Sequence, residues 1–101
     1  MALGATMATG IPQAFCVVPG PGILNTTAAL STAFAVNAPV LSLAGQIPSH
    51  AIGKGYDLLH EIPDHLGITK GLTKWAERIE NRETASEITK NTGDKNGKAR
   101  W

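Results

Sequence analysis

A Pro-Gly-Pro-Gly tetrapeptide, Pro19 to Gly22, separates a short apolar run from a segment rich in alanine. The run before it, residues 14–18, is β-branched and aromatic, which is typical of a buried strand. The alanine-rich segment, residues 23–36, is predicted to be a helix, and a second apolar run follows at residues 40–44. The order strand, tight loop, helix and strand predicts a βαβ unit with two parallel strands.

The tetrapeptide lies where a strand ends and a helix begins, so free backbone N–H groups and a positive dipole end collect there. Such a junction can hold a polar or anionic group of a ligand, and glycine lets the backbone come close to it. A plain turn between a strand and a helix is the alternative interpretation. Gly45 and Gln46 leave the second predicted strand at its carboxyl end, the edge where open α/β sheets bind ligands.

Charge is distributed unevenly along the chain, because residues 1–53 contain no Asp, Glu, Lys or Arg. A half-chain without charges is predicted to be buried between a sheet and other protein layers. It opens with a predicted helix, residues 1–9, that Gly10 ends. The net charge of +1 provides no long-range attraction for nucleic acid or a membrane surface. The fold class predicted is α/β, with an incomplete parallel sheet.

The second half of the chain has weaker signals. Short helices are predicted around residues 58–61 and 64–66, and Thr73 to Ile79 are predicted to form a third strand. A helix is predicted from residue 83 to residue 90. The last segment, residues 91–101, is polar and contains glycine, so disorder is predicted.

Cys16 is the only cysteine, so no internal disulfide can form, and its apolar neighbours predict a buried structural thiol. A single thiol suits the reducing cytoplasm. The first residues lack the features of a signal peptide, and no uncharged stretch is apolar enough to span a bilayer. The spacing of His50, His60 and His65 fits no metal-ligand pair, so no metal site is predicted.

Several short motifs, in order along the chain, resemble those of thiamine diphosphate enzymes of the acetolactate synthase type. Residues 2–12 are similar to "GYARATGKP", Pro19 to Gly22 with Asn25 to "SGPGATN", and residues 38–48 to "SVPLVAITGQVP". His60-Glu61 falls at the family's "FQE", and residues 67–75 fall at "GITRPVTKH". No single motif is strong, but their shared order makes the resemblance specific.

The resemblance implies that residues 1–80 are part of an N-terminal pyrimidine-binding domain and that residues 81–101 are a divergent tail. Its fold would be a three-layer sandwich with a parallel sheet, here incomplete. The implied contacts to thiamine diphosphate come from six residues. They are Pro19, Gly20, Pro21, Gly22, Asn25 and Gln46. For Asn25 the alternative is a helix-terminal residue that bonds backbone N–H groups, and for Gln46 it is a loop amide that satisfies buried backbone.

The resemblance also implies a lyase or carboligase that acts on 2-oxo acids. The family's activating glutamate lies upstream of the segment that matches Ala2 to Gly10, and its diphosphate- and Mg²⁺-binding motif belongs to a later domain. We therefore expect the 101-residue chain to be inactive by itself, with no catalytic residue of its own. The remaining parent enzyme, as a homodimer or tetramer, would be its partner. A non-catalytic α/β interaction module and a non-functional fragment remain the alternatives.

Overall fold

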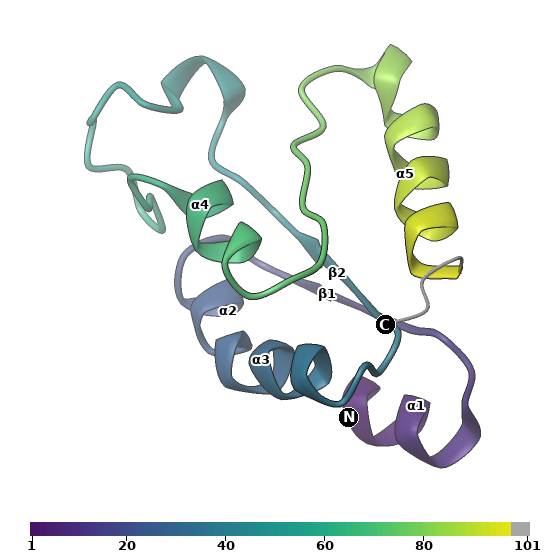
Figure 1. Cartoon of the computed structure of the whole chain (residues 1–101). Coiled ribbons are helices and arrows are strands. Elements are labelled where there is room, and N and C mark those ends of the chain that lie inside the picture. Colours follow the sequence, from purple (N-terminus) through teal and green to yellow (C-terminus); the bar gives the residue numbers. More distant parts are fainter. Residues whose placement is uncertain (98–101) are drawn as a thin grey trace.

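The computed structural model describes residues 1–97, with side chains described as far as Thr92. Its centre is a βαβ unit in which strand β1 (Gln13–Val17) pairs in parallel with strand β2 (Val40–Ala44). The register aligns Gln13 with Val40 and Val17 with Ala44. Figure 1 shows the two strands side by side, with the helices of the connection beside them. The α/β class and the incomplete parallel sheet are confirmed.

The connection between the strands is two helices, where the sequence predicted one over residues 23–36. Helix α2 (Pro21–Leu24) begins at a proline, whose missing N–H costs nothing at the first helical position. Helix α3 (Thr27–Ala35) begins after a break. The hydroxyl of Thr26 donates to the carbonyl of Ile23 at 2.7 Å, and that of Thr27 donates to Leu24 at 2.8 Å. These threonines bond the last carbonyls of α2, which favours a turn over a continuous helix.

Helix α1 (Ala2–Thr9) confirms the first predicted helix, and Gly10 ends it in the left-handed conformation with φ 69°. The helix contacts both strands and α3. Its buried residue is Thr6, whose hydroxyl lies 2.8 Å from the carbonyl oxygen of Ile11 and 3.3 Å from that of Pro39. The Thr6 hydroxyl therefore ties α1 to the segments that enter both strands.

Replacing Thr6 by valine keeps the shape of the side chain but removes the hydroxyl that joins α1 to Ile11 and Pro39. Both carbonyls keep a donor from Gln13, so we expect the free energy of unfolding to fall by about 0.5 to 1.5 kcal/mol, the usual net value of one hydrogen bond. Urea unfolding followed by circular dichroism measures the change. Thr9→Val is the matched control, because the Thr9 hydroxyl bonds an exposed carbonyl of its own helix. An equal loss in both variants would contradict a tertiary role for Thr6.

The second half of the chain forms fewer regular elements than predicted. It contains the short 3₁₀ turn η1 (Ser49–Ala51), helix α4 (His65–Lys70) and helix α5 (Arg82–Gly97). Residues 58–61 form a turn in place of a helix, with the Glu61 N–H donating to Leu58 at 2.9 Å. Asp64 caps α4 by accepting a hydrogen bond from the Gly67 N–H at 2.9 Å.

The third strand predicted over Thr73 to Ile79 is wrong, because these residues are irregular. The hydroxyl of Thr73 donates to the carbonyl of Thr69 at 2.7 Å, which holds the start of the segment on the end of α4. After this segment, Asn81 caps α5, since its side-chain oxygen accepts from the Thr84 N–H at 3.0 Å. The helix α5 continues across residues 91–97, where the sequence predicted disorder, and residues 98–101 lie outside the described residues.

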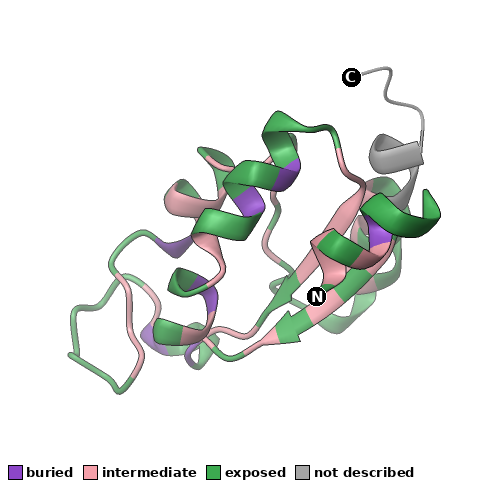
Figure 2. Ribbon diagram, turned by 90° about the horizontal axis from the view of Figure 1, so that it is seen from below, coloured by how far each residue is buried: buried purple, intermediate pink, exposed green. Residues whose placement is uncertain are grey.

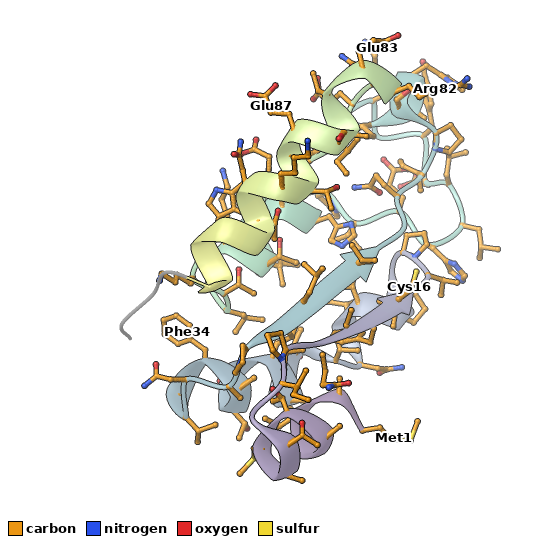
Figure 3. The ribbon with its side chains drawn as sticks, turned by 90° about the vertical axis from the view of Figure 1, so that its right-hand side faces the viewer. Met1, Cys16, Phe34, Arg82, Glu83 and Glu87 are labelled. Carbon is orange, nitrogen blue, oxygen red and sulfur yellow. The ribbon has the colours of Figure 1, made fainter. Side chains whose placement is uncertain are left out.

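The apolar core is small and lies on the helices and loops rather than on the strands. Figure 2 shows buried positions on the helices, whereas the two strands are intermediate or exposed. The buried apolar side chains are Ile23, Leu30, Ala33, Ile47 and Ala51. The prediction of two fully buried strands is therefore wrong, because the described elements leave much of the sheet uncovered. Cys16, which the sequence predicted to be buried, is exposed on β1 (Figure 3).

Many large apolar side chains of the charge-free half are exposed as well. Phe34 is 56% exposed, Val18 is 58% exposed and Leu43 is 46% exposed. Large exposed apolar side chains that gather in a patch are typical of surfaces that pack against other protein. Within residues 1–97, none of the helices combines the length and apolar character that crossing a bilayer requires.

Candidate functional site

The Pro19–Gly22 loop lies at the carboxyl end of β1 and leads directly into α2. Gly20 is buried and is the N-cap of α2, with φ 64° and ψ −120°. That conformation is open almost only to glycine. The Leu24 N–H then donates to the carbonyl of Gly20 at 3.1 Å, which starts the helix. The loop is therefore a sharp, conformationally demanding turn at the end of a strand.

Gly20 is packed directly against His60, which lies 40 positions later in the chain. A Cβ atom added to Gly20 would lie 2.8 Å from the Cα and Cβ atoms of His60 and 2.9 Å from its carbonyl oxygen. His60 itself has a positive φ of 68°. The turn that holds it is closed by the Leu58 N–H, which donates to the Glu61 carboxylate at 2.8 Å. The sequence predicted a short helix around residues 58–61, and no local signal indicates the contact of His60 with the loop.

Gly45 and Gln46 lie beside the same loop, at the carboxyl end of β2. The Gly45 N–H donates to the carbonyl of Val17 at 2.9 Å, and a Cβ on Gly45 would lie 3.0 Å from Cδ of Pro19. The side-chain oxygen of Gln46 accepts from the Ile47 N–H at 2.8 Å. That bond leaves the amide NH₂ of Gln46 as a donor. The structure therefore brings five of the six predicted site residues to one edge of the sheet.

Asn25, the sixth predicted site residue, is exposed at the C-terminal end of α2. Its backbone N–H donates to Pro21 at 3.0 Å, and its side chain makes no hydrogen bond within the described part of the chain. The alternative of a cap on backbone N–H groups therefore does not hold. A role of Asn25 in binding a ligand stays a prediction.

A cavity of about 510 Å³ lies along β2 on the side of α4 and α5, a volume in the range of small-molecule sites. Gly45 and Gln46 line it, whereas Pro19 to Gly22 and Asn25 do not. The hydroxyl oxygen of Ser42, on β2, is buried without a hydrogen-bond partner. The sequence did not predict this cavity, because its lining comes from β2, α4 and α5, which are far apart along the chain.

His65 is the most buried ionisable side chain at the cavity, with 7% of its surface exposed. Burial lowers the pKa of His65 below its ordinary value of 6.5, and the positive charge of Arg78 lowers it further. His65 is therefore protonated to a smaller extent at pH 7 than an ordinary histidine. Within the described residues, no three His, Cys, Asp or Glu side chains lie together in a way that could hold a metal ion.

The predicted site residues contain no charged side chain. Their donors and acceptors are the backbone groups of Pro19, Gly20, Pro21 and Gly22, together with the amides of Asn25 and Gln46. Neutral amides and backbone groups suit an uncharged heteroaromatic ring such as an aminopyrimidine. They do not suit a diphosphate with Mg²⁺, which needs carboxylate oxygens and cationic side chains. The residues present fit one end of thiamine diphosphate and not the other.

A parallel βαβ unit with a glycine- and proline-rich loop at its carboxyl edge is characteristic of open α/β domains, which as a class bind ligands at that edge. Residues 1–68 match the sequence model described as thiamine pyrophosphate enzyme, N-terminal TPP binding domain. The chain therefore belongs to the family of thiamine pyrophosphate enzymes, whose members depend on this cofactor. The domain boundary predicted at residue 80 stays a prediction.

Curated relatives agree with this family. The chain is 36% identical over 83 residues to the mitochondrial acetolactate synthase catalytic subunit of Saccharomyces cerevisiae, covering 82% of this chain and 12% of the relative. It is 31% identical to a probable 2-ketoarginine decarboxylase of Pseudomonas aeruginosa, and the match covers 87% of this chain and 16% of that protein. It is also 31% identical to the large subunit of acetolactate synthase isozyme 3 of Escherichia coli, and this match covers 89% of this chain and 15% of that protein.

The chain thus spans between 12% and 16% of the length of these relatives. No solved structure matches it with statistical significance. The comparisons confirm the resemblance that the short ordered motifs indicated. The chain is related to thiamine diphosphate enzymes.

Proposed function

We propose that this chain forms part of the pyrimidine half-site of a thiamine diphosphate-dependent lyase or carboligase acting on 2-oxo acids. The observation that carries the proposal is the convergence of Pro19 to Gly22 with Gly45 and Gln46 at the carboxyl edge of a parallel strand pair. The family match supports thiamine diphosphate as the ligand that this edge would bind. The relative named as a 2-ketoarginine decarboxylase supports a 2-oxo acid as the class of substrate.

Each residue of the half-site has a distinct task in the proposal. The backbone of Pro19 to Gly22 shapes the surface on which the heteroaromatic ring lies, and prolines keep it stiff. The Gln46 amide, whose oxygen is already bonded to the Ile47 N–H, donates to a ring nitrogen or to substrate. Asn25, exposed at the C-terminal end of α2, provides a second amide. When bound, thiamine diphosphate supplies an electron sink for making or breaking a carbon–carbon bond beside a carbonyl.

In this proposal, activation of the cofactor and binding of its diphosphate depend on residues outside these 101. The neutral half-site has no carboxylate to activate the cofactor, and Mg²⁺ with the diphosphate is bound by other domains of the parent enzyme. The partner is the rest of that enzyme, as a homodimer or tetramer, in the reducing cytoplasm. Nucleic acid and membranes are not partners. The polypeptide alone is expected to leave pyruvate unchanged, and decarboxylation by the purified chain would contradict this.

A non-catalytic interaction module or a non-functional fragment is the second candidate. The exposed apolar side chains favour it, because a charge-free half with Phe34 and Val18 in solvent is prone to association. Size-exclusion chromatography separates the two forms of this candidate. A compact monomer indicates a module, whereas aggregation indicates a fragment that folds only within a larger protein.

Ligand titration tests the half-site. We expect thiamine and thiamine diphosphate with Mg²⁺ to raise the melting temperature of the chain to a similar extent at equal saturation, since only the ring end has a site here. Gln46→Ala is expected to weaken binding by about tenfold, the value of one hydrogen bond of about 1.4 kcal/mol. Isothermal titration calorimetry measures both affinities.

The matched control is Gln13→Ala, which removes the same amide at the opposite end of the strand pair, where it bonds Ile11. Binding should be unchanged in this variant. A chain with native circular dichroism that binds neither thiamine compound at millimolar concentration would overturn the half-site.

A further inference from the structure

The free edge of β2, on the side away from β1, has no partner strand among the described residues. The Gly45 N–H donates to the carbonyl of Val17 at 2.9 Å, so the odd-numbered residues of β2 direct their backbone groups toward β1. The alternate residues direct theirs away from β1. No hydrogen bond to another described residue engages these outward N–H and C=O groups, which belong to Val40, Ser42 and Ala44.

The cavity of about 510 Å³ follows this free edge. It is lined by all five residues of β2, Val40–Ala44. Successive side chains of a strand point to opposite faces of a sheet, so a cavity on one face would be lined by alternate residues only. Contact with every residue of β2 therefore places the cavity along the edge. Figure 3 shows α5, which also lines the cavity, on the side of β2 opposite β1.

The walls of the cavity are mainly apolar. Leu30 and Phe34 of α3, Leu66 of α4 and Ile88 of α5 contribute to them. Among the described residues, the lining from α3, β2 and α5 contains no ionisable side chain. Strand β2 also lacks the proline or charged residue that commonly blocks an exposed strand edge. The cavity therefore suits uncharged apolar side chains, together with a group that bonds the unpartnered Ser42 hydroxyl.

We propose that this edge is a docking groove for one extended apolar segment of a partner protein, which adds a third strand to the sheet beside β2. Backbone donors and acceptors at every second residue are matched by the backbone of another strand. The groove continues the established β1–β2 ladder, and its uncharged walls match apolar side chains on both faces of the added strand. This proposal does not depend on the cofactor.

A second copy of this chain fits the groove less well than a single segment. Helices α4 and α5 line the cavity, so they flank the free edge of β2. In a second copy the same helices would flank its own β2. The two edges could pair only if these helices moved apart in both copies, whereas an isolated extended segment requires no such movement.

Hydrogen exchange followed residue by residue by NMR tests the strand pairing. The probe is a fluorescein-labelled peptide of five β-branched residues, Val-Ile-Val-Val-Ile, with a Gly-Lys-Lys tail for solubility. We expect saturating peptide to slow exchange at the Ser42 and Ala44 amides by at least about tenfold, because a ladder hydrogen bond protects an amide. Exchange at the Ala14 and Cys16 amides, on the free edge of β1, should not change.

Two changes separate the backbone ladder from apolar contact. Ser42→Pro removes one N–H that faces the groove and no bond to β1, so it should weaken peptide binding by about tenfold in fluorescence anisotropy. Ala14→Pro is the matched control, because it removes an outward N–H from the edge of β1, and binding should be unchanged. The same peptide with every backbone nitrogen methylated should also bind at least about tenfold more weakly.

Four outcomes would overturn the docking groove. Unchanged exchange at Ser42 and Ala44 would show that no strand pairs there, and equal protection at Ala14 and Cys16 would show that binding is not selective for β2. Equal affinity of the methylated peptide would indicate apolar contact without a ladder. Protection that rises with the concentration of the chain alone would assign the edge to a second copy. The methylated peptide decides the matter even where Ser42→Pro loses its native circular dichroism.

Discussion

Gly20→Ala is expected to lower the free energy of unfolding by about 2 to 6 kcal/mol, since strained backbone and overpacking each cost about 1 to 3 kcal/mol. The added Cβ would lie within 2.9 Å of three atoms of His60, two of which belong to its backbone. Neither backbone atom can rotate away. The φ of 64° with ψ −120° adds strain that no neighbouring movement relieves. Urea unfolding followed by circular dichroism measures the loss.

Gly10→Ala is the matched control for this substitution. Gly10 has a similar φ of 69°, but a Cβ there would meet no atom within 4 Å. We expect a loss of about 1 kcal/mol, the cost of the left-handed conformation alone. Equal losses at the two glycines would show that the loop and His60 are not in contact in solution. A larger loss at Gly20 is expected from the contact with His60 together with the more restricted φ 64°, ψ −120° conformation.

The elements with local signals could be predicted from the sequence. Helix α1 and its glycine stop, both strands and their parallel order follow from apolar runs, a Gly-Pro turn and Gly10. The edge that gathers Pro19 to Gly22 with Gly45 and Gln46 could be predicted for the same reason. Parallel strands joined by a crossover must end on one side, so the loops that follow them meet.

What could not be predicted depends on contacts between distant segments. The strand patterns indicate burial, but burial of β1 and β2 requires covering layers that the described residues do not supply. Thr73 to Ile79 have a strand-like composition, yet the Thr73 hydroxyl holds the segment on α4. The contact of Gly20 with His60 joins residues 40 positions apart, and a positive φ at a histidine has no sequence signal.

The second large effect is expected at Ile23, the core residue immediately behind the Pro19–Gly22 loop. Its side chain is 1% exposed and is the largest fully buried side chain among the described residues. Ile23→Ala should lower the free energy of unfolding by about 2 to 5 kcal/mol, since the cavity adds to the lost burial. That is a large part of the roughly 5 to 15 kcal/mol that stabilises a domain of this size.

Two matched variants separate burial from local helix effects. Ile23→Val removes one methyl group and should cost about 0.5 to 1.5 kcal/mol. Leu24→Ala changes the next residue of the same helix, but Leu24 is 42% exposed, so the loss should be about 1 kcal/mol. Urea titrations of all three variants measure the order. An equal loss in Leu24→Ala and Ile23→Ala would mean that α2 does not pack against the core through Ile23. The Pro19–Gly22 loop, which leads into α2, would then lack the rigid support that a pyrimidine half-site needs.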